Sequence, residues 1–295
     1  ALGTALPPSG GGSVKRTTII LLTLCVLLCG CAQQRDEAPP VTEETDAHTF
    51  APELLPAEDD ANQWTLTDFS GCFDDTWETA REEVPIDEEI SVTVLRGEAH
   101  GPTVYVVAGI HGDEVAGWRA GNLLKDAHLR AGTLCIISPA NAYGAEHDQR
   151  KTAEERDLNR NFPGDADGCD AERIAEVIFA DIARRQPELL LDLHEAHEAS
   201  GGGADALGNS LVCDAVGDTG ELIWELLLAS ERGTLCASAL TLYGSPPHGS
   251  INRTVTELLE IPAITVETLR TEPLAQRVRN HLEIVQYVLQ YENML

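Results

Sequence analysis

Two histidines and one glutamate of this chain have the types and spacing of a catalytic metal site. His111 and Glu114 are three residues apart in the segment 109–114 (GIHGDE), and His194 ends the segment 188–194 (ELLLDLH). Two imidazoles and one carboxylate that leave a fourth position open are the usual ligands of catalytic zinc. A structural zinc site would use cysteines at short spacings, and the chain has no Cys-x-x-Cys pair.

Two further motifs carry residues that the hydrolysis of an amide would need. Asn159 and Arg160 lie in the segment 156–164 (RDLNRNFPG), and an arginine fork beside an amide suits bidentate binding of a carboxylate. Arg160 could instead be a salt-bridged structural arginine. Glu267 lies in the apolar segment 263–268 (AITVET), where an acidic side chain needs a partner or a chemical role. A water molecule at the metal would supply both.

Buried strands are expected to position these motifs. Residues 103–109 (TVYVVAG) and 188–194 are apolar runs typical of parallel strands that are covered on both faces. Residues 113–127 follow as a predicted helix, with acidic residues in its first turn. Since open α/β sheets bind ligands at the carboxyl ends of their strands, both histidines are expected at one edge of a sheet. A lone His-x-x-Glu would more often begin an exposed helix, and the other motifs favour the metal site.

The alternation of strand and helix patterns continues along the chain. After a strand over 133–138, a long polar loop, 141–168, carries Asn159 and Arg160, and loops of that length are usually functional or disordered. Further helices are expected over 171–185, 222–230, 252–260 and 275–290. The predicted fold is a single α/β domain over residues 65–295, with a mixed, mostly parallel twisted sheet and helices on both faces.

In combination, the four motifs resemble the zinc carboxypeptidase superfamily. Within it, the chain is similar to the succinylglutamate desuccinylase and aspartoacylase branch and to the related murein-peptide carboxypeptidases, over about residues 88–290. The resemblance implies one zinc ion per chain, a substrate carboxylate held by two residues and one general base. These roles fall in turn on His111, Glu114 and His194 for zinc, on Asn159 and Arg160 for the carboxylate, and on Glu267 for the base.

The resemblance also implies roles for residues nearer the substrate. Arg150 is similar in place to the family arginine that polarises the scissile carbonyl, and Arg156 competes for that role. Tyr243 precedes Glu267 by about the interval at which digestive-type members carry a mobile tyrosine, so it is expected to cap the substrate, with His248 lining the pocket. An ordinary surface turn rich in Pro and Gly is the alternative for this segment.

The remaining histidines are not expected to bind the metal. His197 would compete with His194 only if the segment were helical, and the strand-end geometry favours His194. His197 is therefore expected beside the site or in solvent. The others have no partners in the sequence pattern and are expected to be exposed: His48, His100, His128, His147 and His281.

Residues 1–31 are predicted to be a signal peptide. A basic pair precedes the apolar run 19–28, which is too short to span a membrane as a stable helix. The segment ending at Cys31 is similar to a bacterial lipobox, which implies lipid attachment to that thiol. Secretion without lipid is the alternative. Residues 32–64, acidic and dotted with proline, are predicted to form a flexible tether. The expected location is the bacterial cell envelope, on the periplasmic or extracellular face.

The charge and the cysteines limit the possible partners. A formal net charge of −29 repels nucleic acid and anionic lipid headgroups. No nucleic-acid partner is therefore expected, and contact with a membrane is expected only through the lipid anchor. Five cysteines follow Cys31, an odd number for an oxidising compartment. Cys135, in an apolar strand, is expected to be a free core thiol, and the sequence predicts no pairing among the others.

The predicted function is that of a zinc-dependent hydrolase of carboxypeptidase type, acting on a small substrate with a carboxylate beside the scissile amide, with cell-wall peptides as candidates. The alternative within the enzymes is an N-acyl-amino-acid deacylase. The carboxypeptidase is preferred because the sequence shows no counterpart of the carboxyl-terminal barrel that aspartoacylase-like relatives carry. An alternative of another class is a non-catalytic zinc-binding or peptide-binding lipoprotein. It is disfavoured because a binding protein needs no general base.

Overall fold

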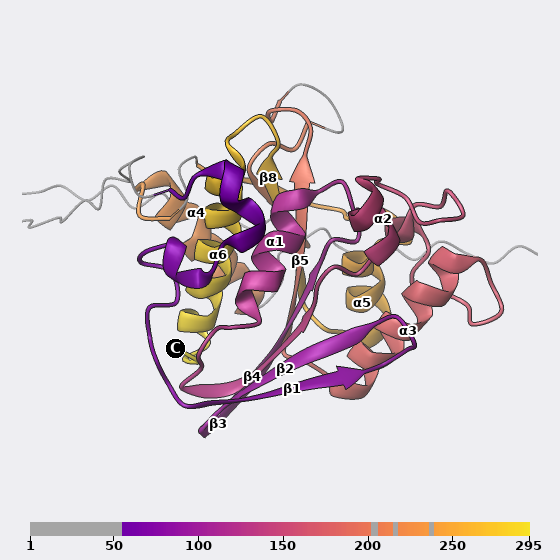
Figure 1. The fold of residues 1–295 in the computed structure, drawn as a ribbon, viewed down its shortest axis with the longest axis horizontal. Coiled ribbons are helices and arrows are strands. Elements are labelled where there is room, and N and C mark those ends of the chain that lie inside the picture. The colour runs from indigo at the N-terminus through magenta and orange to yellow at the C-terminus, as the bar shows by residue number, and fades with distance from the viewer. Residues whose placement is uncertain (1–54, 202–205, 215–217, 236–238) are drawn as a thin grey trace, which may run out of the picture. The chain divides into compact units, whose positions relative to one another are not determined.

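The computed structural model describes residues 55–201, 206–214, 218–235 and 239–295 (Figure 1). Its strands are β1 (Thr79–Pro85), β2 (Ser91–Gly97), β3 (Ala99–Ala108), β4 (Ala131–Ile137), β5 (Leu189–Ala196), β6 (Ser210–Val212), β7 (Thr241–Tyr243) and β8 (Ala263–Leu269). Its helices are α1 (Val115–Leu124), α2 (Ala142–His147), α3 (Asp170–Arg185), α4 (Asp218–Glu231), α5 (Ile251–Leu259) and α6 (Leu274–Tyr291). Three short 3₁₀ helices complete the described elements: η2 (Glu58–Gln63), η3 (Leu66–Asp68) and η4 (Leu158–Arg160).

The described strands form one mixed sheet in the order β1-β2-β4-β3-β5-β8-β6-β7. The four central strands, β4, β3, β5 and β8, run parallel. β2 joins β4 antiparallel at one side, β6 joins β8 antiparallel at the other, and β7 is parallel to β6. Parallel central strands flanked by antiparallel edges confirm the predicted mixed, mostly parallel α/β fold.

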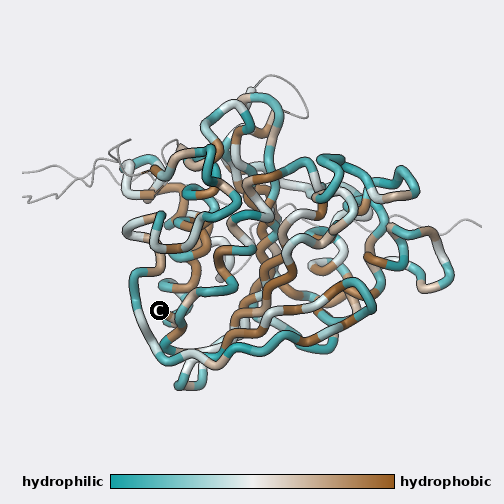
Figure 2. Tube along the Cα trace, in the orientation of Figure 1, coloured by the Kyte–Doolittle hydropathy of each residue, from teal (hydrophilic) through white to brown (hydrophobic). Residues whose placement is uncertain are grey.

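Helices cover both faces of the sheet. Successive residues of a strand face opposite sides, so they pack alternately against the two helical layers. Val104 and Val106 of β3 belong to the core under α1, α4 and α6. Tyr105 and Val107 belong to the core under α3 and α5. The central strands accordingly form the most apolar part of the trace (Figure 2).

Two features of the fold differ from the sequence prediction. The loop 141–168 contains the short helices α2 and η4, which were not predicted. Residues assigned to the tether also pack on the domain, since η2 lies beside α1: the Arg119 guanidinium donates to the carbonyl of Ala61 and, over 2.6 Å, to Oδ1 of Asn62. The ordered domain therefore begins before residue 65.

Residues 1–54, which include the predicted signal peptide, Cys31 and most of the tether, lie outside the described residues. Among the helices that the structure does describe, none combines the length and the apolarity that crossing a membrane requires.

His281 corrects the prediction that it would be exposed. It lies on α6 with no exposed surface, and its Nε2 is 3.1 Å from the hydroxyl of Thr268. Its place in the helix explains the burial, because Val278, Ile284 and Val285 share its face and are buried too. The predicted exposure of His100, His128 and His147 is confirmed, as is Cys135 as a free core thiol. His48 lies outside the described residues.

Candidate metal centre and active site

The motif residues meet at the carboxyl ends of the central strands. β3 ends at Ala108, and the turn that follows it carries His111 and then Glu114, the N-cap residue of α1. β5 carries His194. A glycine is needed in the turn, since a Cβ on Gly112 would lie 1.9 Å from the carbonyl carbon of Gly144 in α2. This close approach sets α2 directly against the histidine-bearing turn.

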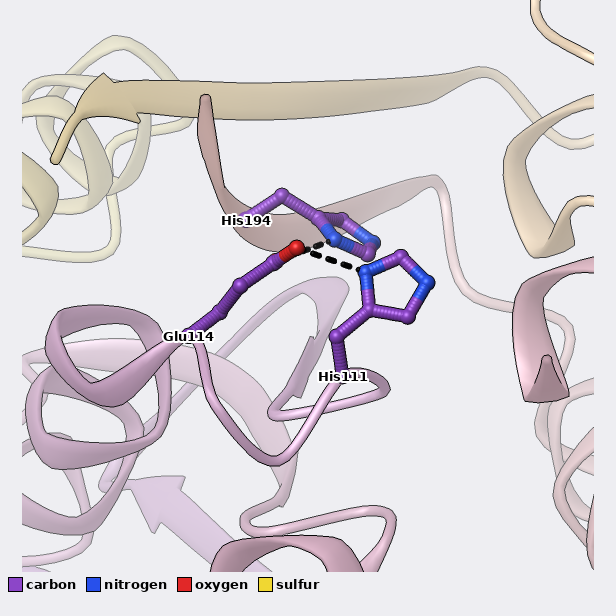
Figure 3. A group of neighbouring side chains, drawn as sticks. All are labelled: His111, Glu114 and His194. Atoms are coloured by element: carbon purple, nitrogen blue, oxygen red, sulfur yellow. Dashed lines mark hydrogen bonds and ion pairs between the residues drawn. The ribbon is translucent and has the colours of Figure 1, made fainter. Parts of the chain in front are cut away.

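His111, Glu114 and His194 converge on one point (Figure 3). Nδ1 of His111 lies 2.7 Å from Oε1 of Glu114, and Nδ1 of His194 lies 2.7 Å from Oε2 of the same carboxylate. All three side chains are buried, and their potential ligand atoms lie within 4.8 Å of one another. The structure thus brings together the three predicted metal ligands.

The outer nitrogens of both imidazoles face carboxylates as well. Nε2 of His111 is 3.1 Å from Oδ1 of Asp157, and Nε2 of His194 is 2.9 Å from Oδ2 of Asp192. An ionised carboxylate only accepts hydrogen bonds, so each aspartate holds its histidine as the Nε2–H tautomer. The lone pair on each Nδ1 then points at Glu114. Lone pairs and a carboxylate repel one another unless a proton or a cation lies between them, so this donor set fits a divalent metal ion.

The electrostatics of the cluster lead to the same conclusion. Burial by itself lowers the pKa of His194, but the carboxylates of Asp192 and Glu114 outweigh burial and raise that pKa well above its ordinary value. Burial by itself raises the pKa of Glu114, and the imidazoles of His111 and His194 outweigh it and hold that pKa well below its ordinary value. The site therefore stabilises positive charge between buried carboxylates.

Contacts with β5 and, through it, with α6 support Glu114. The backbone N–H of Glu195 donates to Oε2 of Glu114 over 3.0 Å. The Glu195 side chain points to the other face of β5, where it accepts from the N–H of Ala116 over 2.8 Å and is paired with Arg277 of α6. This carboxylate caps the first turn of α1, so α6, β5 and α1 together hold the central ligand in place.

Glu267 lies directly across the strand pair from His194, in register with it. The residue is 9% exposed, and its side chain forms no hydrogen bond or ion pair with any described residue. Burial raises the pKa of Glu267 to about 7, with the nearby carboxylates of Glu114 and Asp192 acting in the same direction and His194 against them. A carboxyl group with a pKa near the working pH is suited to accepting and returning a proton.

Of the two candidate arginines, the structure brings Arg150 to the metal ligands. Its Nη1 donates to Oε1 of Glu114 over 3.3 Å, and its Nη2 donates to Oδ2 of Asp157 over 3.1 Å. Arg156 is exposed and lies near Glu172 of α3 instead. Arg150 is thus at the rim of the cluster, with its guanidinium fixed by two carboxylates.

The predicted carboxylate-binding pair divides between buried and exposed positions. Asn159 is buried, its Oδ1 accepts from the N–H of Ile251 over 2.9 Å, and its Nδ2 is 3.2 Å from Nε2 of His194. Arg160 is exposed and donates from Nη1 to the carbonyl of Asn159 over 2.7 Å. Asn159 therefore joins η4 to the start of α5 beside the cluster, and Arg160 presents its charge to solvent.

The other predicted substrate residues lie farther along the same side. Tyr243 ends β7, and its hydroxyl donates to the carbonyl of Ala206 over 3.3 Å. His248 is exposed in the turn before α5. Among the described residues, neither contacts the metal ligands. His197 lies 3.3 Å from Arg270 and is not one of the converging ligands, as expected.

Sequence reasoning gave no role to Asp157 or Asp192, although both stand inside the motifs. Asp192 precedes His194 by two positions on one strand, a spacing that places both side chains on the same face. This spacing was the available signal for Asp192. Asp157 reaches His111 across a loop, and no spacing in the sequence predicts that contact.

Comparisons with known proteins show which families this chain resembles. Residues 100–207 match the family model described as the succinylglutamate desuccinylase/aspartoacylase catalytic domain. A curated relative, the N-alpha-acetyl-L-2,4-diaminobutyric acid deacetylase of Halomonas elongata, is 38% identical over 111 residues. That stretch covers 36% of this chain and 31% of the relative, so the match spans less than a third of the deacetylase.

Solved structures share the fold at low sequence identity. A succinylglutamate desuccinylase/aspartoacylase from Rhodobacter sphaeroides has a TM-score of 0.54 at 21% identity, covering 76% of this chain and 68% of that one. The apo form of the cell shape determinant protein Csd4 from Helicobacter pylori has a TM-score of 0.58 at 21% identity, covering 74% and 55%. The family model and the deacetylase confirm the predicted resemblance to the succinylglutamate desuccinylase/aspartoacylase branch, and the solved structures confirm the fold.

Proposed function

We propose that the protein is a zinc-dependent hydrolase that cleaves an amide beside a free carboxylate in a small substrate. The observation that carries this proposal is the convergence of two imidazoles on one buried carboxylate, with Glu267 in register beside them. Two histidines and one glutamate are the ligand set of several zinc hydrolases. A zinc ion bound there would polarise the scissile carbonyl and lower the pKa of a water molecule.

The chain's own residues have distinct tasks in this reaction. Glu267 accepts the proton of the attacking water and returns it to the leaving amine. Arg150 donates to the carbonyl oxygen as that oxygen gains negative charge, and its contacts with Glu114 and Asp157 fix its direction beforehand. Arg160, exposed beside the cluster, supplies positive charge for the substrate carboxylate. Asn159 holds that segment against the site.

Deacylation of an N-acyl amino acid is the reaction that the comparisons favour. The matches at the level of sequence are to a desuccinylase/aspartoacylase domain and to a deacetylase. The neighbour named as a D,L-carboxypeptidase, Csd4 of Helicobacter pylori, is similar in fold alone, at 18% identity. We therefore place the deacylase first and the carboxypeptidase second, which reverses the order preferred from the sequence.

A substrate panel tests both reactions at once. The zinc-loaded chain is incubated with N-acetyl-L-2,4-diaminobutyrate, N-acetyl-L-aspartate, N-succinyl-L-glutamate and a peptide ending in meso-diaminopimelate. We expect release of acetate or succinate from an acyl amino acid, and no turnover of the same compounds with the carboxylate amidated. Turnover of the peptide alone would establish the carboxypeptidase. Binding without turnover of any compound would support the non-catalytic binding protein instead.

We also propose that Cys31 carries a lipid that anchors the protein in a bacterial envelope, with residues up to the start of η2 as the tether. The support is the basic pair, the short apolar run and the cysteine that follows it in the sequence. Cys31→Ser should abolish labelling by a fatty-acid probe and release the protein from the membrane fraction. A wild-type chain that is unlabelled and not membrane-associated would contradict the proposal.

A further inference from the structure

The residues that pair across the strands beside the site include one residue of β6. His194 of β5 pairs with Glu267 of β8, and Glu267 pairs with Ser210 of β6. Directly opposite residues on neighbouring strands point to the same face. Leu211 and Val266, the next pair in register, lie in the core under α4 and α6. Ser210 and Glu267 therefore face the other side, where the metal ligand His194 also points.

Both members of this pair lack a hydrogen bond. Ser210 has no exposed surface, and its Oγ has no partner among the described residues. The Glu267 carboxylate also has none within the described structure. Buried hydroxyl groups are rarely left without a partner, because losing the hydrogen bond to water is costly. A hydroxyl donor and a carboxylate acceptor with Cβ atoms about 4.5–5.5 Å apart complement each other.

The register that places Ser210 opposite Glu267 is fixed by the residue that precedes β6. The side chain of the preceding Asn209 accepts at Oδ1 from the N–H of Leu269 over 3.0 Å. Its Nδ2 donates to Oε1 of Glu272 over 2.6 Å. One amide thus ties β6 to the end of β8.

A second asparagine fixes the other end of the strand. Nδ2 of Asn252 donates to the carbonyl of Val212 over 2.8 Å and to the hydroxyl of Thr265 on β8 over 3.0 Å. A slip of one residue would turn Ser210 to the opposite face. A strand of three residues that is held at both ends keeps Ser210 opposite Glu267.

We propose that Ser210 is a positioning residue for Glu267. Its hydroxyl donates to one carboxylate oxygen and leaves the other free to exchange a proton with the attacking water. The inference rests on the proposed role of Glu267 as the general base. Because Ser210 is fully buried, it is neither a nucleophile nor a substrate contact. Its effect belongs to kcat, since the metal ligands and the carboxylate-binding residues do not depend on it.

The test compares Ser210→Ala, Ser210→Cys and Ser210→Thr in the zinc-loaded full chain. Each is assayed with N-acetyl-L-2,4-diaminobutyrate, N-acetyl-L-aspartate, N-succinyl-L-glutamate and a peptide ending in meso-diaminopimelate, and the substrate that the wild type turns over fastest is used. We expect Ser210→Ala and Ser210→Cys to lower kcat about tenfold or more, as for a lost hydrogen bond to a charged group. KM, zinc content and Tm should stay near wild type. Ser210→Thr, which keeps the hydroxyl, should restore most of kcat.

Thr268→Val is the matched control. Thr268 is the next residue on β8, its hydroxyl is buried, and it faces the opposite side with His281 as its partner. This variant should lower Tm and leave kcat unchanged. An equal loss of kcat in Thr268→Val and Ser210→Ala would mean that any buried hydroxyl of these strands matters, and would overturn the inference.

A double-mutant cycle with Glu267→Ala separates this inference from the proposed function. Ser210→Ala should cause no further loss of kcat once the carboxylate is gone. Wild-type kcat in Ser210→Ala, with Glu267→Ala inactive, would refute the role of Ser210 alone. Wild-type kcat in Glu267→Ala would refute the general base, and the role of Ser210 with it.

Discussion

At the scale of single residues, the two aspartates that orient the histidines are not equivalent. Asp157 shares its carboxylate between His111 and Arg150, and it is partly exposed. Asp192 is fully buried, with Oδ2 on His194 and Oδ1 without a partner in the described structure. The outer nitrogen of His194 therefore faces a buried carboxylate that contacts no arginine among the described residues, whereas the carboxylate at His111 is also held by Arg150.

Asp192→Asn tests the contact between Asp192 and His194. The amide keeps the shape of the side chain, but it can donate a hydrogen bond and so permits the wrong tautomer of His194. We expect zinc affinity to fall about 10–100-fold, as is typical when an outer carboxylate is lost, in a competition titration against a chelator. Asp181→Asn is the control, because Asp181 is equally buried but bonds Tyr105 on α3's side of the sheet. That variant should lower Tm and retain the zinc affinity. Wild-type affinity in Asp192→Asn would contradict the tautomer argument.

Glu267→Gln tests the proposed role of Glu267 as the general base. The substitution keeps shape and removes the basic carboxylate, so zinc content and Tm should stay near wild type while kcat falls by ~10² to 10⁴. The carboxyl must be ionised to act, and burial raises its pKa to about 7. A bound cation favours the ionised form, so kcat/KM of the wild type should fall with decreasing pH through a limb at or below about 7. Loss of zinc in the variant would identify Glu267 as a ligand instead.

At the scale of elements, the sequence predicted the strands that are buried on both faces. β3, β5 and β8 each contain a largely apolar run, so their ends, and with them His111, His194 and Glu267, could be located. β6 and β7 have three residues each, too few for a periodic pattern, so the position of Ser210 could not be predicted. The hairpin of β1 and β2 was missed as well.

The site residues that depend on loops were the least predictable. Arg150 and Arg156 could not be distinguished by spacing, because only the path of the chain after α2 decides which one reaches Glu114. The burial of Asn159 follows from its contact with Ile251, 92 residues away, and no local pattern contains such a contact.

Gly112→Ala tests the contact between the histidine turn and α2. The added Cβ would meet the backbone of Gly144 at 1.9 Å, so α2 and the chain leading to Arg150 must shift. We expect a lower Tm, weaker zinc binding and a lower kcat, measured on the same preparation. Gly220→Ala in α4, whose Cβ would meet nothing within 4 Å, should raise Tm by the helix propensity of alanine and leave activity unchanged. Wild-type zinc affinity in Gly112→Ala would show that the turn tolerates a displaced α2.

At the scale of the whole molecule, helices cover both faces of the sheet. His194 and Glu267 point to the face that α3 and α5 cover. His281 on α6 is a titratable group that is fully buried in the other layer. Burial lowers the pKa of His281 to about 3, against about 6.5 in an unfolded chain. The unfolded state therefore binds the proton more readily than the folded state.

The pH dependence of unfolding follows from this difference. The stabilising effect of neutral His281 is fully present above about pH 6.5 and is lost as the pH falls from there toward about 3. His281→Gln should flatten the decline of Tm across that range, measured by thermal melts of the metal-free protein. His128→Gln, at an exposed position, should leave the decline unchanged. An unaltered decline in His281→Gln would assign acid lability to other groups.

The pairing of Glu195 with Arg277 means that one support of the proposed metal ligand Glu114 lies on the opposite side of the sheet from the proposed substrate contacts. Arg277 and Glu195 support Glu114 from the α6 layer. By contrast, Arg150, which with Arg160 is a proposed substrate contact, reaches Glu114 from the site. Natural or laboratory selection can therefore adjust metal retention through Arg277 without disturbing substrate choice. Libraries randomised around Arg277 should yield variants that exchange zinc faster yet rank the same substrates in the same order, and a changed ranking would contradict this independence.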